Sequence, residues 1–251
     1  MADKILGYSI YCENITTFLN EVFISLNSNN KKKVWLACIN PHSYYLALSD
    51  KLFKKALNSS DWLVPDGIGI VYASYFLRGN IRNRITGSDI FYGLNDMMDC
   101  KGGKSVFFLG STKDNLDTLS ALFKRDYPNI RLAGVYSPPF VLNFNDEENN
   151  KIIEIINNAK VDVLWVGLSA PKQEKWIVEN LPLLEVNFVA AIGAVFDFYT
   201  GKIRRSNKFF QTLGLEWLPR LIQEPKRLWK RMFISAPVFI WHVLLKLFKL
   251  Y

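Results

Sequence analysis

Short apolar runs alternate with amphipathic segments along most of the chain. Six runs rich in β-branched and aromatic residues predict strands at residues 34–38, 62–64, 106–109, 130–135, 161–166 and 188–192. Between them, apolar side chains recur at helical spacing over residues 43–58, 88–99, 113–125, 146–158 and 172–180. Strands that alternate with helices predict an α/β fold, with a Rossmann-like, largely parallel sheet flanked by helices.

The pattern changes after residue 201. Tryptophan and leucine interleave with arginine and lysine over residues 215–231, and residues 232–245 then carry no charge. This run of fourteen residues is shorter than the roughly 20 that cross a bilayer, and Pro237 interrupts it. We therefore predict an α/β domain over residues 1–201, as one unit or two lobes, followed by a basic, amphipathic helical appendage over residues 202–251 that lies at a membrane surface. An ordinary C-terminal helix docked on the core is the alternative.

The positive charge is concentrated in the same appendage. The chain has 31 lysines and arginines and 23 acidic residues, a formal net charge of +8. Eleven basic and two acidic residues follow residue 201, so the appendage carries +9 and the rest of the chain −1. This asymmetry indicates an anionic partner for the appendage: nucleic acid, anionic lipid or a phosphate-bearing substrate. A merely solvated basic face is the alternative.

Other sequence signals narrow the choice of protein class. The N-terminus lacks the basic region and apolar run of a secretory signal, which predicts a cytoplasmic location. Cys12, Cys38 and Cys100 are scattered and have no metal-ligand spacing, so reduced thiols are expected rather than a zinc site. No GxGxxG follows a strand, which argues against a dinucleotide-dependent oxidoreductase.

Polar and turn residues gather directly after the predicted strands. They include Asn40 and His42 after the first run, Asp66 and Gly67 after the second, Gly110 and Ser111 after the third, Gly167 after the fifth and Gly193 after the last. In open α/β sheets, ligands bind outside the carboxyl ends of the strands, where loops and helix N-termini supply donors to anions. The sequence therefore predicts one composite site at that edge.

Asp66 is the strongest candidate for chemistry. Packing gives little reason for an acid after an apolar strand, and a carboxylate near a substrate hydroxyl can take its proton. The alternative is that Asp66 caps a helix that begins near Ile68. Gly67 is expected to let the backbone approach a ligand closely.

Other polar residues allow both a structural and a functional interpretation. Arg84 precedes a helix start at Thr86 or Ser88, yet an arginine there could also neutralise a leaving diphosphate. Gln173 lies at a helix N-terminus and could bind a base or a sugar. His42 is as consistent with a packed polar residue as with a functional one. Gly110 and Ser111 begin a phosphate-loop-like turn that lacks the Walker lysine.

Five sequence blocks, in order, resemble the WecG/TagA/CpsF group, glycosyltransferase family 26. They lie at residues 65–69, 84–89, 167–174, 193–202 and, as a pair, 214–217 with 224–227. The resemblance extends from about residue 34 to residue 231. It implies an inverting, metal-independent transferase without a cofactor that uses a UDP-sugar, most often of the N-acetylmannosamine type. The implied acceptor is an undecaprenyl-diphosphate-linked sugar, in teichoic acid or cell-surface polysaccharide synthesis.

The resemblance also implies roles for individual residues. Asp66 corresponds to the general base, and Asn40 and Arg84 correspond to pocket residues. Because an arginine there could neutralise a leaving diphosphate, Arg84 is the second candidate catalytic residue. The resemblance makes Gln173 a donor contact. With the residues selected above from the strand ends, the candidate substrate-binding residues are Cys38, Asn40, Gly67, Gly110, Ser111, Gly167 and Gln173. The implied lipid-diphosphate-binding residues of the appendage are Arg220, Arg227 and either Lys230 or Arg231.

Two departures from the family pattern keep the donor sugar open. Cys38 stands where the family usually has threonine, and Ser169 where it often has a second glycine. A glucose or uronic acid donor is therefore an alternative. The expected location is the inner face of the cell membrane, peripherally bound, and a homo-oligomer stays open. A nucleic-acid-binding protein would need a binding module that the sequence lacks, and a nonenzymatic membrane adaptor would not explain the polar residues at the strand ends.

Overall fold

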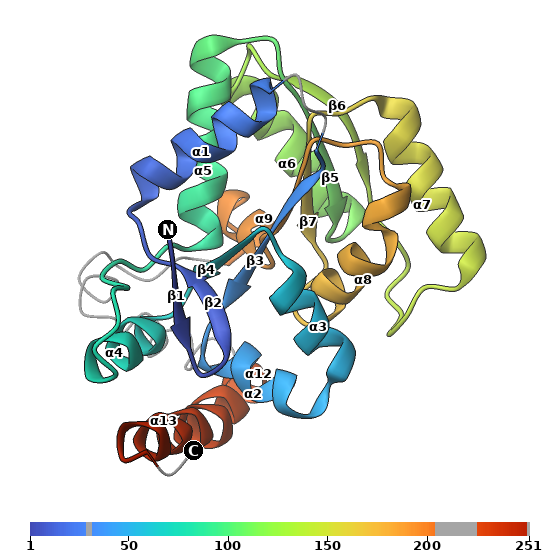
Figure 1. Ribbon diagram of the computed structural model, residues 1–251. Helices are drawn as coiled ribbons and strands as arrows, with labels where there is room; N and C mark the ends of the chain where they lie inside the picture. Colours follow the sequence, from blue (N-terminus) through green and yellow to red (C-terminus); the bar gives the residue numbers. More distant parts are fainter. Residues whose placement is uncertain (29–31, 204–224, 250–251) are drawn as a thin grey trace.

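A six-stranded parallel sheet forms the centre of the computed structural model, which describes residues 1–28, 32–203 and 225–249, with side chains in the last range from residue 228 (Figure 1). The strand order is β4 (Trp62–Pro65), β3 (Val34–Ile39), β8 (Phe188–Ala191), β7 (Val163–Gly167), β5 (Ser105–Gly110) and β6 (Arg131–Tyr136). Each predicted strand is present, with bounds within two residues of those expected. The prediction of a parallel α/β fold is confirmed.

Helices cover both faces of this sheet, because successive strand side chains point to opposite sides. Phe107 packs on one face, and its neighbour Phe108 packs on the other. The first face is covered by α2 (Pro41–Ser49), α3 (Lys51–Ser59), α7 (Asp146–Ala159) and α8 (Lys172–Asn180). The second face is covered by α1 (Ile15–Asn27), α5 (Gly87–Lys101), α6 (Lys113–Asp126) and the short α9 (Val195–Tyr199).

The structure adds elements that the apolar pattern did not predict. An antiparallel hairpin of β1 (Ala2–Ile5) and β2 (Tyr8–Tyr11) precedes α1. The helix considered near Ile68 is present as α4 (Ile68–Phe76), which follows β4. The single helix predicted over residues 43–58 is two helices, because Asp50 ends α2 and caps α3. Its Oδ1 accepts a hydrogen bond from the Phe53 amide at 2.9 Å, and its Oδ2 lies 3.0 Å from Lys175 Nζ.

The C-terminal helix is longer than the apolar run suggested. It comprises α12 (Pro225–Lys230), a π-helical turn (Arg231–Ser235) and α13 (Ala236–Leu247). Pro237 does not break it, because this residue lies in the first turn of α13, where a missing N–H costs least. The stretch Leu228–Leu247 has 20 residues, and an 18-residue window within it has a mean hydropathy of 1.2 and is 22% buried. By length and composition alone, this stretch could cross a membrane. The inference that the uncharged run of fourteen residues is too short to do so is therefore wrong.

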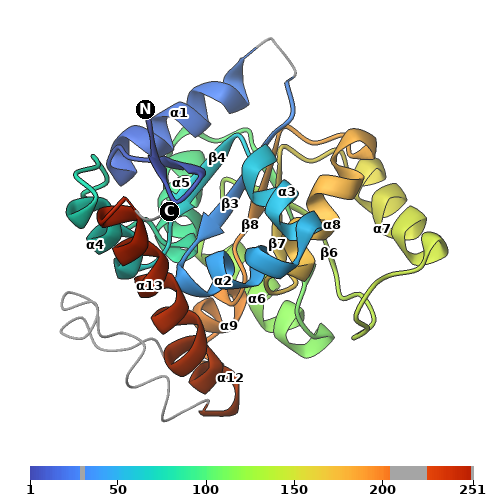
Figure 2. The ribbon, with the colours of Figure 1, turned by 60° about the horizontal axis from the view of Figure 1, so that its bottom comes forward.

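One face of α13 is docked on the core, beside α2 and α4 (Figure 2). Phe239 and Val243 are buried, and the Phe239 ring lies 5.3 Å from that of Tyr44 in an edge-on contact. The Tyr44 hydroxyl is 2.7 Å from His242 Nδ1. The alternative of a docked C-terminal helix therefore describes this face, while the opposite face exposes large apolar side chains, including Phe233 and Trp241.

Candidate active site

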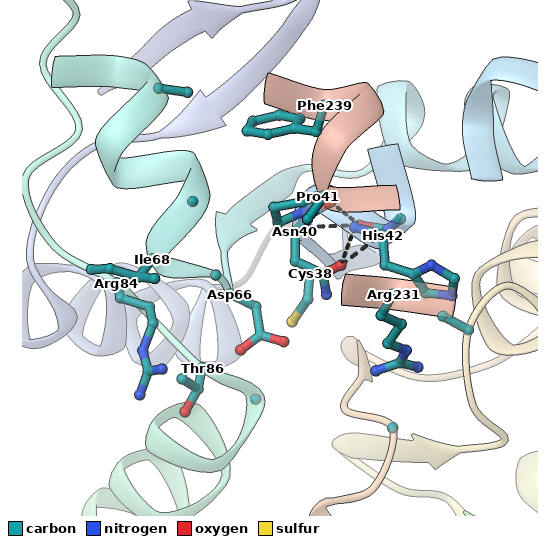
Figure 3. A pocket seen from close by; sticks show the side chains of 18 of the residues that line it. Cys38, Asn40, Pro41, His42, Asp66, Ile68, Arg84, Thr86, Arg231 and Phe239 are labelled. Carbon is teal, nitrogen blue, oxygen red and sulfur yellow. Dashed lines mark hydrogen bonds between the residues drawn. The ribbon is translucent and has the colours of Figure 1, made fainter. Parts of the chain in front are cut away.

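A cavity of about 920 Å³ opens at the carboxyl ends of β3, β4 and β8 and is closed on one side by the C-terminal helix. The loops after these strands supply its polar wall, as the edge of a parallel sheet requires. The structure brings together there the predicted residues Cys38, Asn40, Asp66, Gly67, Arg84, Gln173 and Arg231. Figure 3 shows Cys38, Asn40, Asp66, Arg84 and Arg231 around the cavity.

Asp66 is held at the end of β4 by backbone hydrogen bonds. Its amide donates to the Ile39 carbonyl at 2.9 Å, and the Ile85 amide donates to the Pro65 carbonyl at 2.9 Å, which ties the Arg84 loop to the same strand. Asp66 does not cap α4, because the N-cap residue is Gly67 and no side chain caps this helix. In Figure 3 the Asp66 carboxylate points into the cavity, with Arg84 on one side and Arg231 on the other.

The α2 and α4 N-termini meet closely beside Asp66. Asn40 caps α2, and its Oδ1 accepts from the His42 and Ser43 amides at 3.0 Å each. That leaves the amide nitrogen of Asn40 as the atom available to a ligand. A Cβ at Gly69 would lie 2.7 Å from Pro41 Cγ, so the glycine permits close helix approach. Gly67 acts similarly, because a Cβ there would lie 3.0 Å from Asn40 Cβ.

Gln173 connects two walls of the cavity. Its side chain is 3% exposed; Oε1 accepts from the Gly193 amide at 3.1 Å, and Nε2 donates to Glu174 Oε1 at 2.9 Å. The amide therefore fixes the loop after β8 against the start of α8. One Nε2 hydrogen remains for a substrate.

Glu174 is a site residue to which the sequence analysis assigned no role. It lines the cavity with 1% of its surface exposed, and its Oε2 has no hydrogen-bond partner among the described residues. Burial raises the pKa of this carboxyl to about 7. Burial also raises the pKa of the Cys38 thiol, with the charges of Asp66 and Glu174 adding to it, so Cys38 stays protonated at neutral pH.

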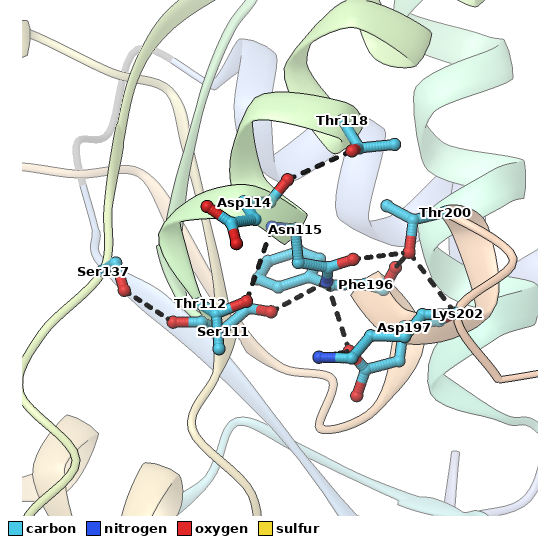
Figure 4. A network of polar contacts seen from close by, with 10 residues as sticks. All are labelled: Ser111, Thr112, Asp114, Asn115, Thr118, Ser137, Phe196, Asp197, Thr200 and Lys202. Atoms are coloured by element: carbon cyan, nitrogen blue, oxygen red, sulfur yellow. Dashed lines mark hydrogen bonds and ion pairs between the residues drawn. The ribbon is translucent and has the colours of Figure 1, made fainter.

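Ser111 belongs to a different polar network, next to the cavity rather than in its wall (Figure 4). Asn115 Nδ2 donates to Ser111 Oγ at 2.8 Å and to Asp197 Oδ1 at 3.2 Å. The Thr200 hydroxyl donates to Asn115 Oδ1 at 2.7 Å. The network fixes α9, whose first residue, Val195, lines the cavity. The motif at residues 193–202 was noted in the sequence, but its partner on α6 could not be identified there.

Gly110 and Gly167 also lie outside the described cavity lining. They are paired in register on β5 and β7, and Gly110 has φ +118°, where a Cβ would collide with the Gly167 carbonyl. A Cβ at Gly167 would meet the Phe196 ring at 2.6 Å. At both positions the close packing of neighbouring atoms therefore requires glycine, independently of any contact with a ligand. Ser169 has φ +66°, a conformation that favours the glycine often found there in the family.

The appendage residues are placed unequally. Arg231 lines the cavity, while the adjacent Lys230 is exposed outside the lining. Arg227 lies in α12 with its side chain outside the described residues, and Arg220 lies outside them entirely. The π-helical turn that begins with Arg231 contacts the α/β domain at its other end, because His42 Nδ1 lies 2.8 Å from Ser235 Oγ.

Thr86 rather than Ser88 caps α5. Its hydroxyl accepts from the Asp89 amide at 3.2 Å and donates to Asp89 Oδ2 at 2.7 Å, which forms a capping box at the cavity edge. Within the described part of the chain, no group of three His, Cys, Asp or Glu side chains is placed to hold a metal ion.

Comparison with known proteins gives a consistent result. The profile of the "Glycosyl transferase WecG/TagA/CpsF family" matches residues 4–251. Two similar proteins, both named N-acetylglucosaminyldiphosphoundecaprenol N-acetyl-beta-D-mannosaminyltransferase, come from Bacillus spizizenii and Bacillus subtilis. The first is 31% identical over 92% of this chain and 86% of its own length, and the second 32% over 83% and 78%. A Staphylococcus aureus protein of the same name is 26% identical over 92% of this chain and 85% of its own.

Proposed function

The chain belongs to the WecG/TagA/CpsF family of glycosyltransferases, and we propose that it moves an N-acetylmannosamine-type sugar from a UDP donor to a polyprenyl-diphosphate-linked acceptor sugar. The names of the relatives support this donor sugar and an N-acetylglucosamine acceptor. A UDP-glucose or UDP-uronic acid donor is the second candidate, because Cys38 replaces the usual threonine in the cavity wall.

The observation that carries the proposal is the Asp66 carboxylate, which lies between two arginines in the cavity (Figure 3). Asp66 takes the proton of the acceptor hydroxyl while that oxygen attacks the anomeric carbon. The bond from this carbon to the UDP oxygen breaks on the opposite face, so the configuration inverts. Arg84 stabilises the charge that grows on the departing diphosphate, in the place that a metal ion takes in other transferases. Arg231 contacts the diphosphate of the acceptor.

The other cavity residues bind the donor. The Asn40 amide nitrogen and the remaining Gln173 hydrogen are donors for sugar or nucleotide oxygens. Cys38 presents a neutral thiol to the same space. The reaction takes place at the inner face of the cell membrane, where the exposed apolar face of α13 holds the protein.

A donor screen tests this function. Purified full-length protein is incubated with UDP-N-acetylmannosamine, UDP-glucose or a UDP-uronic acid and with N-acetylglucosamine diphosphate on a lipid, with and without EDTA. We expect transfer from the first donor, with an inverted product and no loss in EDTA. Transfer from another donor would replace the sugar assignment, and magnesium-dependent recovery after EDTA would contradict the role of the arginines. Failure with every donor would overturn the function.

A further inference from the structure

The cavity continues beyond its polar residues into an apolar groove between α4 and α13. On α4 the lining residues are Ile68, Gly69, Tyr72, Ala73 and Phe76, which repeat at three- and four-residue spacing and so form one helix face. On α13 the lining residues are Ala236, Phe239, Ile240, Val243, Leu244 and Leu247, which form a similar face. Neither stripe contains a charged residue.

The groove combines a buried floor with exposed walls. Ala73, Phe239 and Val243 are 3–7% exposed, whereas Phe76 is 58% exposed and Ile240 is 55% exposed. In Figure 3 Phe239 lies at one edge of the cavity, while Arg84 and Arg231 lie toward the opposite edge. Large apolar side chains at the rim of a formed groove are costly to hydrate, so an apolar occupant would gain free energy there.

We propose that this groove binds the first isoprene units of the acceptor's polyprenyl chain. The inference rests on the proposed function and assigns a second substrate-binding region to the same cavity. Polar and apolar lining residues adjoin, as do the diphosphate and the hydrocarbon of such an acceptor. Along α13 the stripe from Ala236 to Leu247 measures about 16 Å, long enough for several units rather than for one methyl-sized group.

This placement gives α13 a specific role. If the polyprenyl chain runs from the diphosphate at Arg231 along the groove, α13 has two functions. It presents apolar residues to the membrane, and it leads the lipid out of the cavity. The acceptor sugar is then fixed beside Asp66 from two directions, by its diphosphate and by its chain. A polyprenyl chain is flexible, so this ordering must be offset by the apolar area that it buries.

The test compares two acceptors that carry the same sugar diphosphate, one on a farnesyl chain and one on a methyl group, in detergent with full-length protein. Phe76→Ser changes a groove residue that is 58% exposed, and Phe248→Ser changes a phenylalanine outside the lining that is 67% exposed. We expect Phe76→Ser to lower the ratio of kcat/KM for farnesyl over methyl acceptor about tenfold, from the loss of a large apolar contact. Phe248→Ser should leave this ratio unchanged. Ala73→Leu, which narrows the floor, should lower it as well.

Several results would overturn the inference. If the wild type has a ratio of kcat/KM for farnesyl over methyl acceptor near one, the protein does not recognise the polyprenyl chain, while the proposed function would stand. Equal effects of Phe76→Ser and Phe248→Ser would assign the groove to general contact with detergent or membrane. A dimer of the wild type that Phe76→Ser dissociates, with the ratio unchanged, would assign it to a second copy of the chain. Absence of transfer to both acceptors would instead remove the proposed function itself.

Discussion

At the scale of single residues, Asp66 is the carboxylate that the cavity places between Arg84 and Arg231. We expect Asp66→Asn to lower kcat about 10²- to 10⁴-fold, the usual contribution of general-base assistance. The backbone hydrogen bonds that hold this loop do not involve the carboxylate, so folding and UDP binding should persist. Transfer assays and UDP titration measure the two effects. More than half of the wild-type rate in a folded variant would exclude Asp66 as the base.

Arg231 and Lys230 provide a matched pair. Arg231 lines the cavity, and Lys230 is exposed beside it. Substitution of either residue by glutamine removes one positive charge from the same helical segment. We expect Arg231→Gln to lower kcat/KM for the acceptor about tenfold to a hundredfold, as the loss of hydrogen bonds to a charged group does. Lys230→Gln should change it by less than about twofold. Similar losses in both variants would indicate that general positive charge, rather than a contact with the diphosphate, is responsible.

Glu174 should make the protein's stability depend on pH. Burial raises its pKa from 4.5 to about 7, so the folded state holds the proton more tightly than the unfolded state. The penalty for an ionised buried carboxylate therefore begins above pH 4.5 and is complete above pH 7. We expect Glu174→Gln to raise the free energy of unfolding by about 2–3 kcal/mol at pH 8 and by little at pH 4.5.

Thermal unfolding at the two pH values measures this difference. Glu179→Gln on the exposed side of α8 is the control, because it removes an acidic residue without changing a buried carboxyl. A gain for Glu174→Gln that is the same at both pH values would mean that its carboxyl is not buried as an ion. UDP binding by the same variant shows whether Oε2 also contacts the donor.

At the scale of elements, the sequence predicted what depends on local repetition. The six core strands are apolar runs that stand out in any context, and parallel strands buried on both faces need such runs. The break between α2 and α3 was missed because Asp50 ends one helix and begins the next within a continuous apolar pattern. The β1–β2 hairpin was missed because its four-residue strands are too short for a periodic signal.

The candidate site, like the fold, contains residues that the sequence indicates and residues that only the structure reveals. Asp66 and Arg84 could be selected from the sequence because Asp66 directly follows β4 and Arg84 lies shortly before α5, where packing does not require a charge. Glu174 was missed because an acid in the first turn of a helix already has an ordinary explanation in the helix dipole. Arg231 and Lys230 could not be distinguished, because only the π-helical turn decides which of two adjacent cations faces the cavity.

The contact between His42 and the π-helical turn predicts a pH-dependent docking of the C-terminal helix. Burial, with Arg231 nearby, lowers the pKa of His42 from 6.5 to about 4. A lowered histidine pKa means that the folded state prefers the neutral ring, so its contribution is fully present above pH 6.5 and is lost as the pH falls toward 4. We expect α13 to be held less tightly by up to about 3 kcal/mol at pH 4.

Hydrogen exchange of the α13 amides, corrected for the intrinsic rate at each pH, measures this loss. His42→Asn keeps a polar atom near Ser235 Oγ but does not titrate, so its protection should vary less between pH 7 and pH 4.5. Equal pH dependence in both proteins would assign the effect to another group. Exchange in α1, on the other side of the sheet, serves as the internal reference.

At the scale of the whole molecule, charge and exposed apolar surface coincide in the C-terminal region. The residues after 201 carry a net +9, and α13 exposes Ile240 and Trp241 while Phe239 holds it to the core. Basic residues near an anionic surface contribute about 1 kcal/mol each, and exposed apolar side chains add their transfer free energy. This combination favours a protein held on the membrane by one face. Removal of α13 would not isolate this role, because its residues also form one wall of the cavity.

Point variants on the exposed face of the C-terminal helix separate its role in membrane binding from its role as a wall of the cavity. Phe233 and Trp241 are 68% and 59% exposed and lie outside the described cavity lining, so we expect Phe233→Glu with Trp241→Glu to abolish sedimentation with anionic vesicles at 0.15 M salt. Each change removes apolar surface and adds a charge that the vesicle repels. Transfer to the methyl acceptor should stay within about twofold, because surface changes of this kind leave the fold intact. Ile24→Glu, at a 69% exposed position on α1, should sediment like the wild type, and wild-type sedimentation should weaken as salt rises. If the double variant still sediments, the membrane contact lies on another face of the molecule, and α13 serves the acceptor chain alone.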